Sequence, residues 1–179
     1  MPYTIEEHKH RFAAWAASRA ASSVKSCRFS VKQGKAILEK AGLWQLLASP
    51  DKLPVPEQTD SRHREWRVSV IQAAEGQGLR FTHGVAAKLI NVYLKAVFVC
   101  GGHHEHESVR ALHPPVDGVL LKELAEQNLG GLRVEWKKAC RICWSNLDSE
   151  QYEKVIHSLR VAMTTEALWK VEQHWRGYQ

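Results

Sequence analysis

The sequence predicts an all-α protein, with residues 1–179 forming a single domain of about eight helices. Three observations lead to this prediction. Apolar residues recur at helical spacing, capping residues precede these runs, and no segment alternates in the way that a half-buried strand does. With 179 residues and an apolar fraction of 44%, the chain is long enough to bury a substantial core.

The first predicted helix follows Thr4. Thr4 and Glu7 form a capping box before the segment EEHKHRFAAWAASRAAS. Its predicted apolar stripe contains Phe12, Trp15 and Ala16, which are spaced as on one face of a helix. We therefore expect this stripe to face the core.

Two further helices are predicted before residue 77. Ser30 and Gln33 form a second capping box, and the helix that follows should end at Gly42. The segment SPDKLPVPEQTD holds three prolines and is predicted to be a loop. Asp60 is the predicted N-cap of a third helix, which should end at Gly76.

A hairpin motif is predicted at about residues 77–100. Residues 77–83 should form the turn, and a helix should run from Gly84 to Cys100. A polar stripe on this helix contains Lys88, Asn91 and Lys95, at offsets of three and seven residues. The predicted buried side contains Val85, Leu89, Ile90, Tyr93, Leu94 and Val97.

The remaining segments also read as loops and helices. A loop is expected over HHEHESVRALHPPV, and Asp117 should cap a helix that reaches about residue 127. Glycines at positions 130 and 131 separate it from a helix over about 133–140. Two final helices are expected, one starting at Asp148 or Ser149 and one over about 166–175.

Charge and cysteine content restrict the class of protein. The net charge of +6 and the pI of about 9.2 suit an anionic partner such as nucleic acid, although an ordinary basic protein has the same balance. We expect no signal peptide and no membrane span, because the first residues are polar and Asn91 and Lys95 interrupt the longest apolar helix. The four cysteines are then expected to be reduced in a cytoplasmic protein, associated with the nucleoid if the source is bacterial.

Lys88 is expected in the first turn of its predicted helix, where the helix dipole disfavours positive charge. Gly84 would allow backbone N–H groups at this helix start to point outward and bind a DNA phosphate. Further along, Pro114 and Pro115 fix the backbone before Asp117 and so aim its carboxylate. The simpler alternative is a solvated lysine on a polar helix face.

The segments THGVAAK and HPPVD resemble the helix-hairpin-helix DNA glycosylase superfamily, in its lysine-bearing, 8-oxoguanine glycosylase-like branch. That family has a hairpin of the type L-P-G-V-G-x-K and then P-V-D at the start of another helix. The matching residues are Gly84, Val85, Lys88, Pro115, Val116 and Asp117. The resemblance covers about residues 77–127, including the catalytic-aspartate loop and helix at about 113–127, and implies a glycosylase-like bundle.

This resemblance implies an enzyme that excises an oxidised purine similar to 8-oxoguanine from damaged double-stranded DNA. Lys88 would be the Schiff-base nucleophile and Asp117 the catalytic carboxylate, so that the enzyme is a β-lyase as well as a glycosylase. It also implies a monomer with no required cofactor, and it allows a monovalent cation at the hairpin. Contacts to the DNA backbone are expected from His83, Gly84, Val85, Ala86, Arg80 and Lys95.

The sequence departs from the family pattern at three places. Ala86 replaces the second hairpin glycine, and His83 stands where the family often has proline. The segment between Lys88 and Asp117 is longer than in eukaryotic-type enzymes, which favours an archaeal-type or divergent branch.

Other candidate residues have weaker support. A base pocket is expected from Trp15, Gln45, Trp144 and Pro115, although tryptophans in such a bundle are more often core residues. The histidine patch, which we define as His103, His104 and His106 and which extends toward His113, could bind zinc or nickel. Cys140 and Cys143 form a lone CxxC, for which two buried apolar residues are the simpler interpretation. The alternative functions are a non-catalytic helix-hairpin-helix DNA-binding module and a metal-binding protein that uses this patch.

Overall fold

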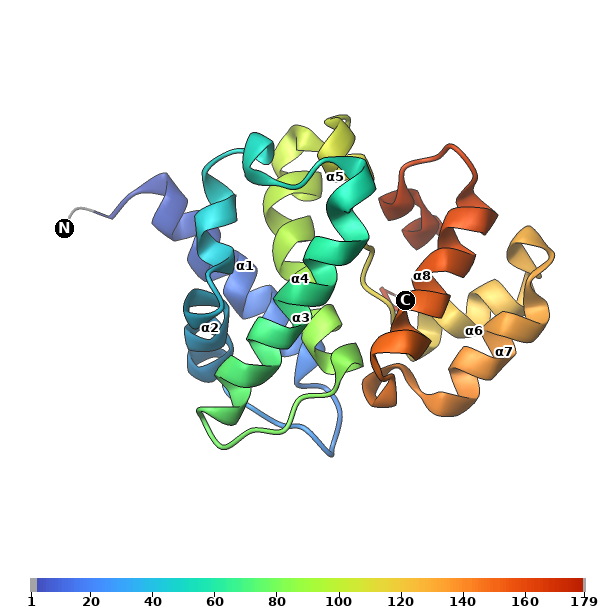
Figure 1. Ribbon diagram of the computed structural model, residues 1–179, viewed down its shortest axis with the longest axis horizontal. Coiled ribbons are helices and arrows are strands. Elements are labelled where there is room, and N and C mark those ends of the chain that lie inside the picture. The colour runs from blue at the N-terminus through green and yellow to red at the C-terminus, as the bar shows by residue number, and fades with distance from the viewer. Residues whose placement is uncertain (1–2, 179) are drawn as a thin grey trace.

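The structure is a computed structural model that describes residues 3–178. It is all-helical, and the described residues contain eight α-helices together with short 3-10 helices and one π-helix, but no strand. The predicted all-α class is therefore confirmed. Figure 1 shows two groups of helices: α1 to α5 lie on one side, and α6 to α8 lie on the other together with the C-terminal segment.

The first group is built around α4. Helix α1 packs along α4 through its small residues, because Ala13, Ala14 and Ala17 are completely buried and allow the two backbones to approach closely. The predicted apolar stripe of α1 is wrong, since Phe12 is 57% exposed and Trp15 is 48% exposed. The α-helices of this group are α1 (Ile5–Ala21), α2 (Val31–Lys40), α3 (Thr59–Glu75), α4 (His83–Leu94) and α5 (Glu107–Arg110).

The capping residues account for several of these boundaries. Thr4 caps α1, and Ser30 with Gln33 forms the predicted capping box of α2. Asp60 was expected to cap α3, but α3 already begins at Thr59 and Asp60 lies in its first turn. The proline-rich segment before α3 is not a plain loop, because it forms three short 3-10 helices: η1 (Leu43–Ala48), η2 (Pro50–Lys52) and η3 (Pro56–Gln58).

Helix α4 is the central helix of the molecule. Its predicted buried side is confirmed, and it continues as a π-helix, η4 (Lys95–His103), which ends where Gly102 adopts a φ of 91°. Within the described chain, the run from His83 to His103 is long and apolar enough to cross a membrane, but 67% of its most apolar stretch is buried inside the protein. A core helix passes the same test, so this run is weak evidence for a membrane span.

The second group follows the connection that leaves α5. This connection crosses from one group to the other in Figure 1 and carries the proline pair before Asp117. Asp117 caps α6 as predicted, and Asp148 caps α8 in a capping box. The elements are α6 (Gly118–Glu126), η5 (Leu129–Gly131), α7 (Arg133–Ile142), η6 (Trp144–Asn146), α8 (Ser149–Met163) and η7 (Leu168–His174). The last expected helix is thus a 3-10 helix.

Candidate functional site

Lys88 and Asp117 form a buried ion pair at the junction of the two helix groups. The Lys88 Nζ donates to Asp117 Oδ2 over 2.9 Å, and the two side chains are 7% and 18% exposed. Helix α4 starts at His83, so Lys88 lies in its second turn, where the helix dipole is weaker than in the first turn that we expected. Burial is instead the main reason why the pKa of Lys88 is lowered, and it outweighs the opposing effect of Asp117.

Asp117 is held by three donors. Its Oδ1 accepts the Leu120 N–H over 2.9 Å, as an N-cap does, and Oδ2 accepts both from Lys88 and from Trp175 Nε1 at 3.0 Å. Burial alone would raise the pKa of Asp117, but the charge of Lys88 and these hydrogen bonds lower it overall. The carboxylate is therefore kept ionised and in one orientation.

A small crevice lies in front of the lysine. It holds about 170 Å³ of empty space but is too narrow to admit a water molecule, and the Trp144 ring forms one wall, with its centroid 5.5 Å from Lys88 Nζ. This distance permits a cation–π interaction. Because not even a water molecule fits into it, the crevice is closed to a nucleobase in this conformation. The lining residues are Gly84, Ala87, Lys88, Asn91, Val116, Trp144, Leu147 and Tyr152.

A second ion pair lies beside the first. Lys95, the first residue of η4, donates to Glu172 of η7, and burial raises the pKa of Glu172. Neither Glu172 nor Trp175 was among the residues singled out from the sequence. A signal was present, because Glu172 stands next to Val171 and one helical turn after Leu168, both of which are buried, and a charged residue so close to an apolar face needs a partner.

The hairpin backbone is not turned outward. The Gly84 N–H donates to the Leu147 carbonyl over 3.0 Å, and a Cβ at Gly84 would lie 1.8 Å from the Trp144 carbonyl oxygen. The expectation that this N–H faces a DNA phosphate is therefore wrong for this conformation, and the glycine is required by close packing against η6. Val85 and Ala86 are also buried, so they present no surface to DNA here.

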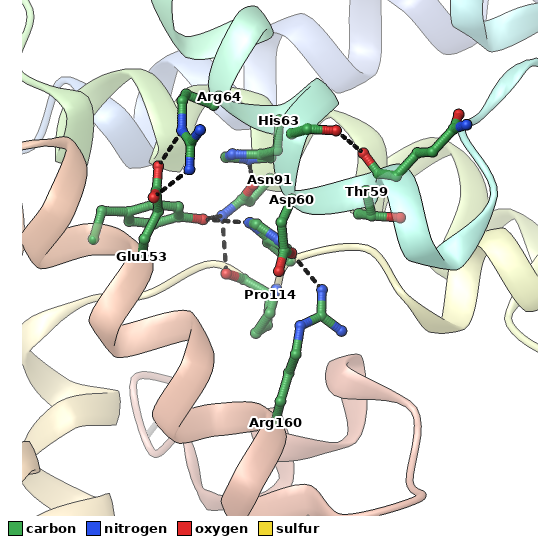
Figure 2. A network of polar contacts seen from close by, with 12 residues as sticks. Thr59, Asp60, His63, Arg64, Asn91, Pro114, Glu153 and Arg160 are labelled. Atoms are coloured by element: carbon green, nitrogen blue, oxygen red, sulfur yellow. Dashed lines mark hydrogen bonds and ion pairs between the residues drawn. The ribbon is translucent and has the colours of Figure 1, made fainter.

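Behind the crevice lies a buried polar network, drawn in Figure 2. Asn91, one turn after Lys88 on α4, accepts from His63 Nε2 over 2.7 Å and donates to the Pro114 carbonyl and the Tyr152 hydroxyl, each over 3.0 Å. Because a carbonyl can only accept, the donor side of the Asn91 amide is fixed, and His63 must carry its proton on Nε2. Asn91 thus ties α4, which carries Lys88, to the loop that aims Asp117.

The network continues to the surface. His113 contacts the Tyr152 hydroxyl at 3.1 Å and Asp60 at 2.8 Å, and Arg160 donates to Asp60 over 2.6 Å. Burial lowers the pKa of both His63 and His113, whereas the contacts with His113 and Arg160 lower the pKa of Asp60. Asp60 therefore joins α3, α8 and the 113–117 loop, in place of its expected role as a helix cap.

A cluster of arginines and one glutamate extends this network along α8. Arg64 donates to Glu153 at 2.8 and 2.6 Å, as Figure 2 shows, and the buried Arg67 donates to the same carboxylate at 2.6 Å. The hydrogen bonds from Arg64 are the main cause that lowers the pKa of Glu153 to about 2. This cluster ties α3 to α8, so that the two helix groups are joined by charge as well as by packing.

The remaining base-pocket candidates lie elsewhere. Trp15 and Gln45 are exposed on α1 and η1 and do not line the crevice, whereas Trp144 does. Pro115 is buried in the loop before Asp117 without lining the crevice. Of the expected phosphate contacts, Arg80 is exposed, but Lys95 is engaged by Glu172.

The histidine patch does not converge. His103 packs against Phe98, His104 packs against Trp169, and His106 pairs with Asp51 at 3.2 Å. Among residues 3–178, no group of three or more His, Cys, Asp or Glu side chains could hold a metal ion. Both cysteines of the CxxC are free, and the expectation that both are buried is wrong, because Cys143 is exposed.

No protein-family model, curated protein or solved structure matches the chain. A functional conclusion therefore depends on the geometry around Lys88. That geometry combines a nearly buried amine, a fixed carboxylate, an aromatic wall and two neighbouring charges.

Proposed function

We propose that the protein is a DNA N-glycosylase with β-lyase activity, which removes an oxidised purine through a Schiff base on Lys88. The observation that carries the proposal is the contact of 2.9 Å between the Lys88 amine and the Asp117 carboxylate. The two residues lie 29 positions apart in the sequence and meet beside a crevice that Lys88 lines together with Trp144. The resemblance of THGVAAK and HPPVD to helix-hairpin-helix glycosylases supplies the reaction class.

The chemistry uses the neutral form of Lys88. Its amine attacks C1′ of the deoxyribose while the purine leaves with the bonding electron pair, and opening of the sugar ring gives an imine. Loss of a proton from C2′ then expels the 3′ phosphate, which is the lyase step. Asp117 accepts a hydrogen bond from the attacking nitrogen and stabilises the positive charge that develops on the sugar. Burial supports this role, because it lowers the pKa of Lys88 and raises the fraction of free amine.

A purine inside duplex DNA must be flipped out before Lys88 can reach its sugar. Trp144 is placed to stack on a flipped base, but the crevice of about 170 Å³ must first widen. The exposed Arg80, in the segment that leads into α4, and His83 remain our candidates for phosphate contacts. We propose that the protein acts as a monomer in the cytoplasm.

One observation favours a non-catalytic alternative. The hydrogen bonds to Asp117 are complete without a ligand, as in an ion pair that only holds two helix groups together. A DNA-binding module that lacks chemistry would show the same arrangement.

Borohydride trapping decides between these readings. The protein is incubated with duplexes that contain 8-oxoguanine or an abasic site, and sodium borohydride then reduces any imine to a stable adduct. We expect an adduct with the wild type and with Lys122→Gln, an exposed control on α6, but none with Lys88→Gln. Binding of DNA by the wild type without any adduct would refute the proposed chemistry and support the module.

A further inference from the structure

Two ion pairs lie near each other at the junction of the helix groups, and the Lys88–Asp117 pair is the more buried of the two. Lys88 and Lys95 are seven residues apart, which is two helical turns, so their side chains lie on the same side of the helical run. Asp117 pairs with the first lysine and Glu172 with the second. The site therefore holds two cations and two anions, all of them at least partly shielded from solvent.

The C-terminal segment touches both pairs. Glu172 and Trp175 are three residues apart at the end of η7, and side chains at this spacing are eclipsed in a 3-10 helix. Glu172 accepts from Lys95, and the Trp175 Nε1–H donates to Asp117 Oδ2 over 3.0 Å. One turn of the chain thus fixes the relative position of the two pairs.

We propose that Lys95 and Glu172 are positioning residues, which set the pH at which the Lys88 amine loses its proton. The part of this inference that concerns catalysis rests on the proposed function. The effect on the lysine itself follows from the arrangement of charges alone.

The charges facing Lys88 act with opposite signs. Asp117 of the 113–117 loop and Glu172 of η7 favour the ammonium form, whereas Lys95 of η4 disfavours it. The remaining titratable neighbour that lines the crevice is Tyr152 of α8, whose hydroxyl is bound to Asn91 and His113 and whose pKa is raised by burial. Glu172 and Lys95 have opposite effects on the protonation of Lys88. Removal of either residue therefore leaves the charge of the other one uncompensated.

A purely structural ion pair makes a different prediction. Loss of either partner would then lower stability and leave the titration of Lys88 in place. Control of the Lys88 proton requires shifts of opposite sign: removal of Glu172 eases deprotonation, and removal of Lys95 hinders it. Removal of both residues should nearly restore the wild-type value.

The test is an NMR titration that needs no DNA. The carbon chemical shift of the Lys88 ε-methylene, assigned from its loss in Lys88→Gln, is followed between about pH 6 and pH 11, a range that brackets the normal lysine pKa. We expect the midpoint to fall by about one pH unit in Glu172→Gln and to rise by about one unit in Lys95→Met, as for a neighbouring charge. The double variant should titrate near the wild type, and Lys95→Arg should retain the wild-type midpoint.

The matched control is the exposed pair of Lys122 and Glu126, whose removal should not move the midpoint. Equal midpoints in all variants, or shifts of the same sign in both single variants, would overturn the inference. If one single variant does not fold, the sign of the midpoint shift in the other single variant still tests the inference, because a purely structural pair predicts no shift.

The catalytic part is read from the rate of borohydride adduct formation against pH on an abasic-site duplex. The alkaline rise of this rate should move with the NMR midpoint in each variant. An adduct whose pH profile is the same in all variants would overturn the inference and leave the proposed function standing. Shifted midpoints without an adduct from any variant would refute the proposed function and leave the control of the Lys88 proton intact.

Discussion

Asn91 offers the sharpest test of how the site is held together. Its side chain is 3% exposed and makes three hydrogen bonds, to His63, to the Pro114 carbonyl and to the Tyr152 hydroxyl. In Asn91→Ala the Tyr152 hydroxyl keeps its contact with His113, but the His63 Nε2–H and the Pro114 carbonyl lose the partner that Asn91 provides. Each buried polar group left unsatisfied costs about 1–3 kcal/mol, so the two together predict a loss of about 2–6 kcal/mol.

Urea unfolding followed by circular dichroism measures this loss directly. The matched control is Asn146→Ala, which removes an exposed asparagine that makes a single hydrogen bond to the Ile142 carbonyl, and we expect it to change the free energy of unfolding by less than about 0.5 kcal/mol. Because the total stability of a domain is about 5–15 kcal/mol, the two variants should differ clearly. A loss below about 1 kcal/mol in Asn91→Ala would show that water or rearrangement satisfies the network, and would refute the claim that Asn91 fixes the aspartate loop.

Three further predictions concern packing, pH and metal. Gly84→Ala places a Cβ at 1.8 Å from the Trp144 carbonyl oxygen and should cost at least about 1–3 kcal/mol in urea unfolding, whereas Gly118→Ala, with open space around it, should not destabilise. An unchanged free energy of unfolding in Gly84→Ala would contradict the packing argument. Burial lowers the pKa of His113, so below about pH 6.5 the unfolded chain binds more protons than the folded protein. The free energy of unfolding should therefore decrease as the pH is lowered from about 6.5. His113→Gln should flatten this pH dependence, whereas the control His157→Gln, at an exposed position, should leave it unchanged. Identical pH dependences of the unfolding free energy in the two variants would contradict the role of His113. Chelator treatment should leave the melting temperature unchanged, since the histidine patch does not converge, and a drop on chelation would reveal a metal that the geometry does not predict.

The sequence predicted the helices best where local chemistry decides them. Capping by Ser30, Asp117 and Asp148 depends on residues within one turn, and all three caps are present. The resemblance to glycosylases predicts that Lys88 and Asp117 lie close together, and the two side chains are in contact. Their catalytic role stays a prediction.

The errors arise where distant parts of the chain decide the outcome. The helical spacing of Phe12, Trp15 and Ala16 predicts an apolar face that packs against the core. Helix α1 instead presents its alanines to α4, since only small side chains allow the backbones to come close. Likewise, nothing near Gly84 in the sequence indicates that the Trp144 carbonyl will occupy the space beside it.

The proposed reaction requires the closed site around Lys88 and Asp117 to open, and the contacts of the surrounding side chains indicate which of them hold it closed. Lys88 and Asp117 lie on segments that Asn91 joins through buried hydrogen bonds, so moving either segment would expose several unsatisfied groups. Trp175 is bound to Asp117 by one hydrogen bond, and the Arg176–Glu123 ion pair next to it involves an arginine that is 60% exposed. A hydrogen bond to a charged group contributes about 1.5–3 kcal/mol. Trp175 does not line the crevice, so displacing its side chain would uncover the Asp117 carboxylate, whereas opening the crevice itself requires a lining residue such as Trp144 to move.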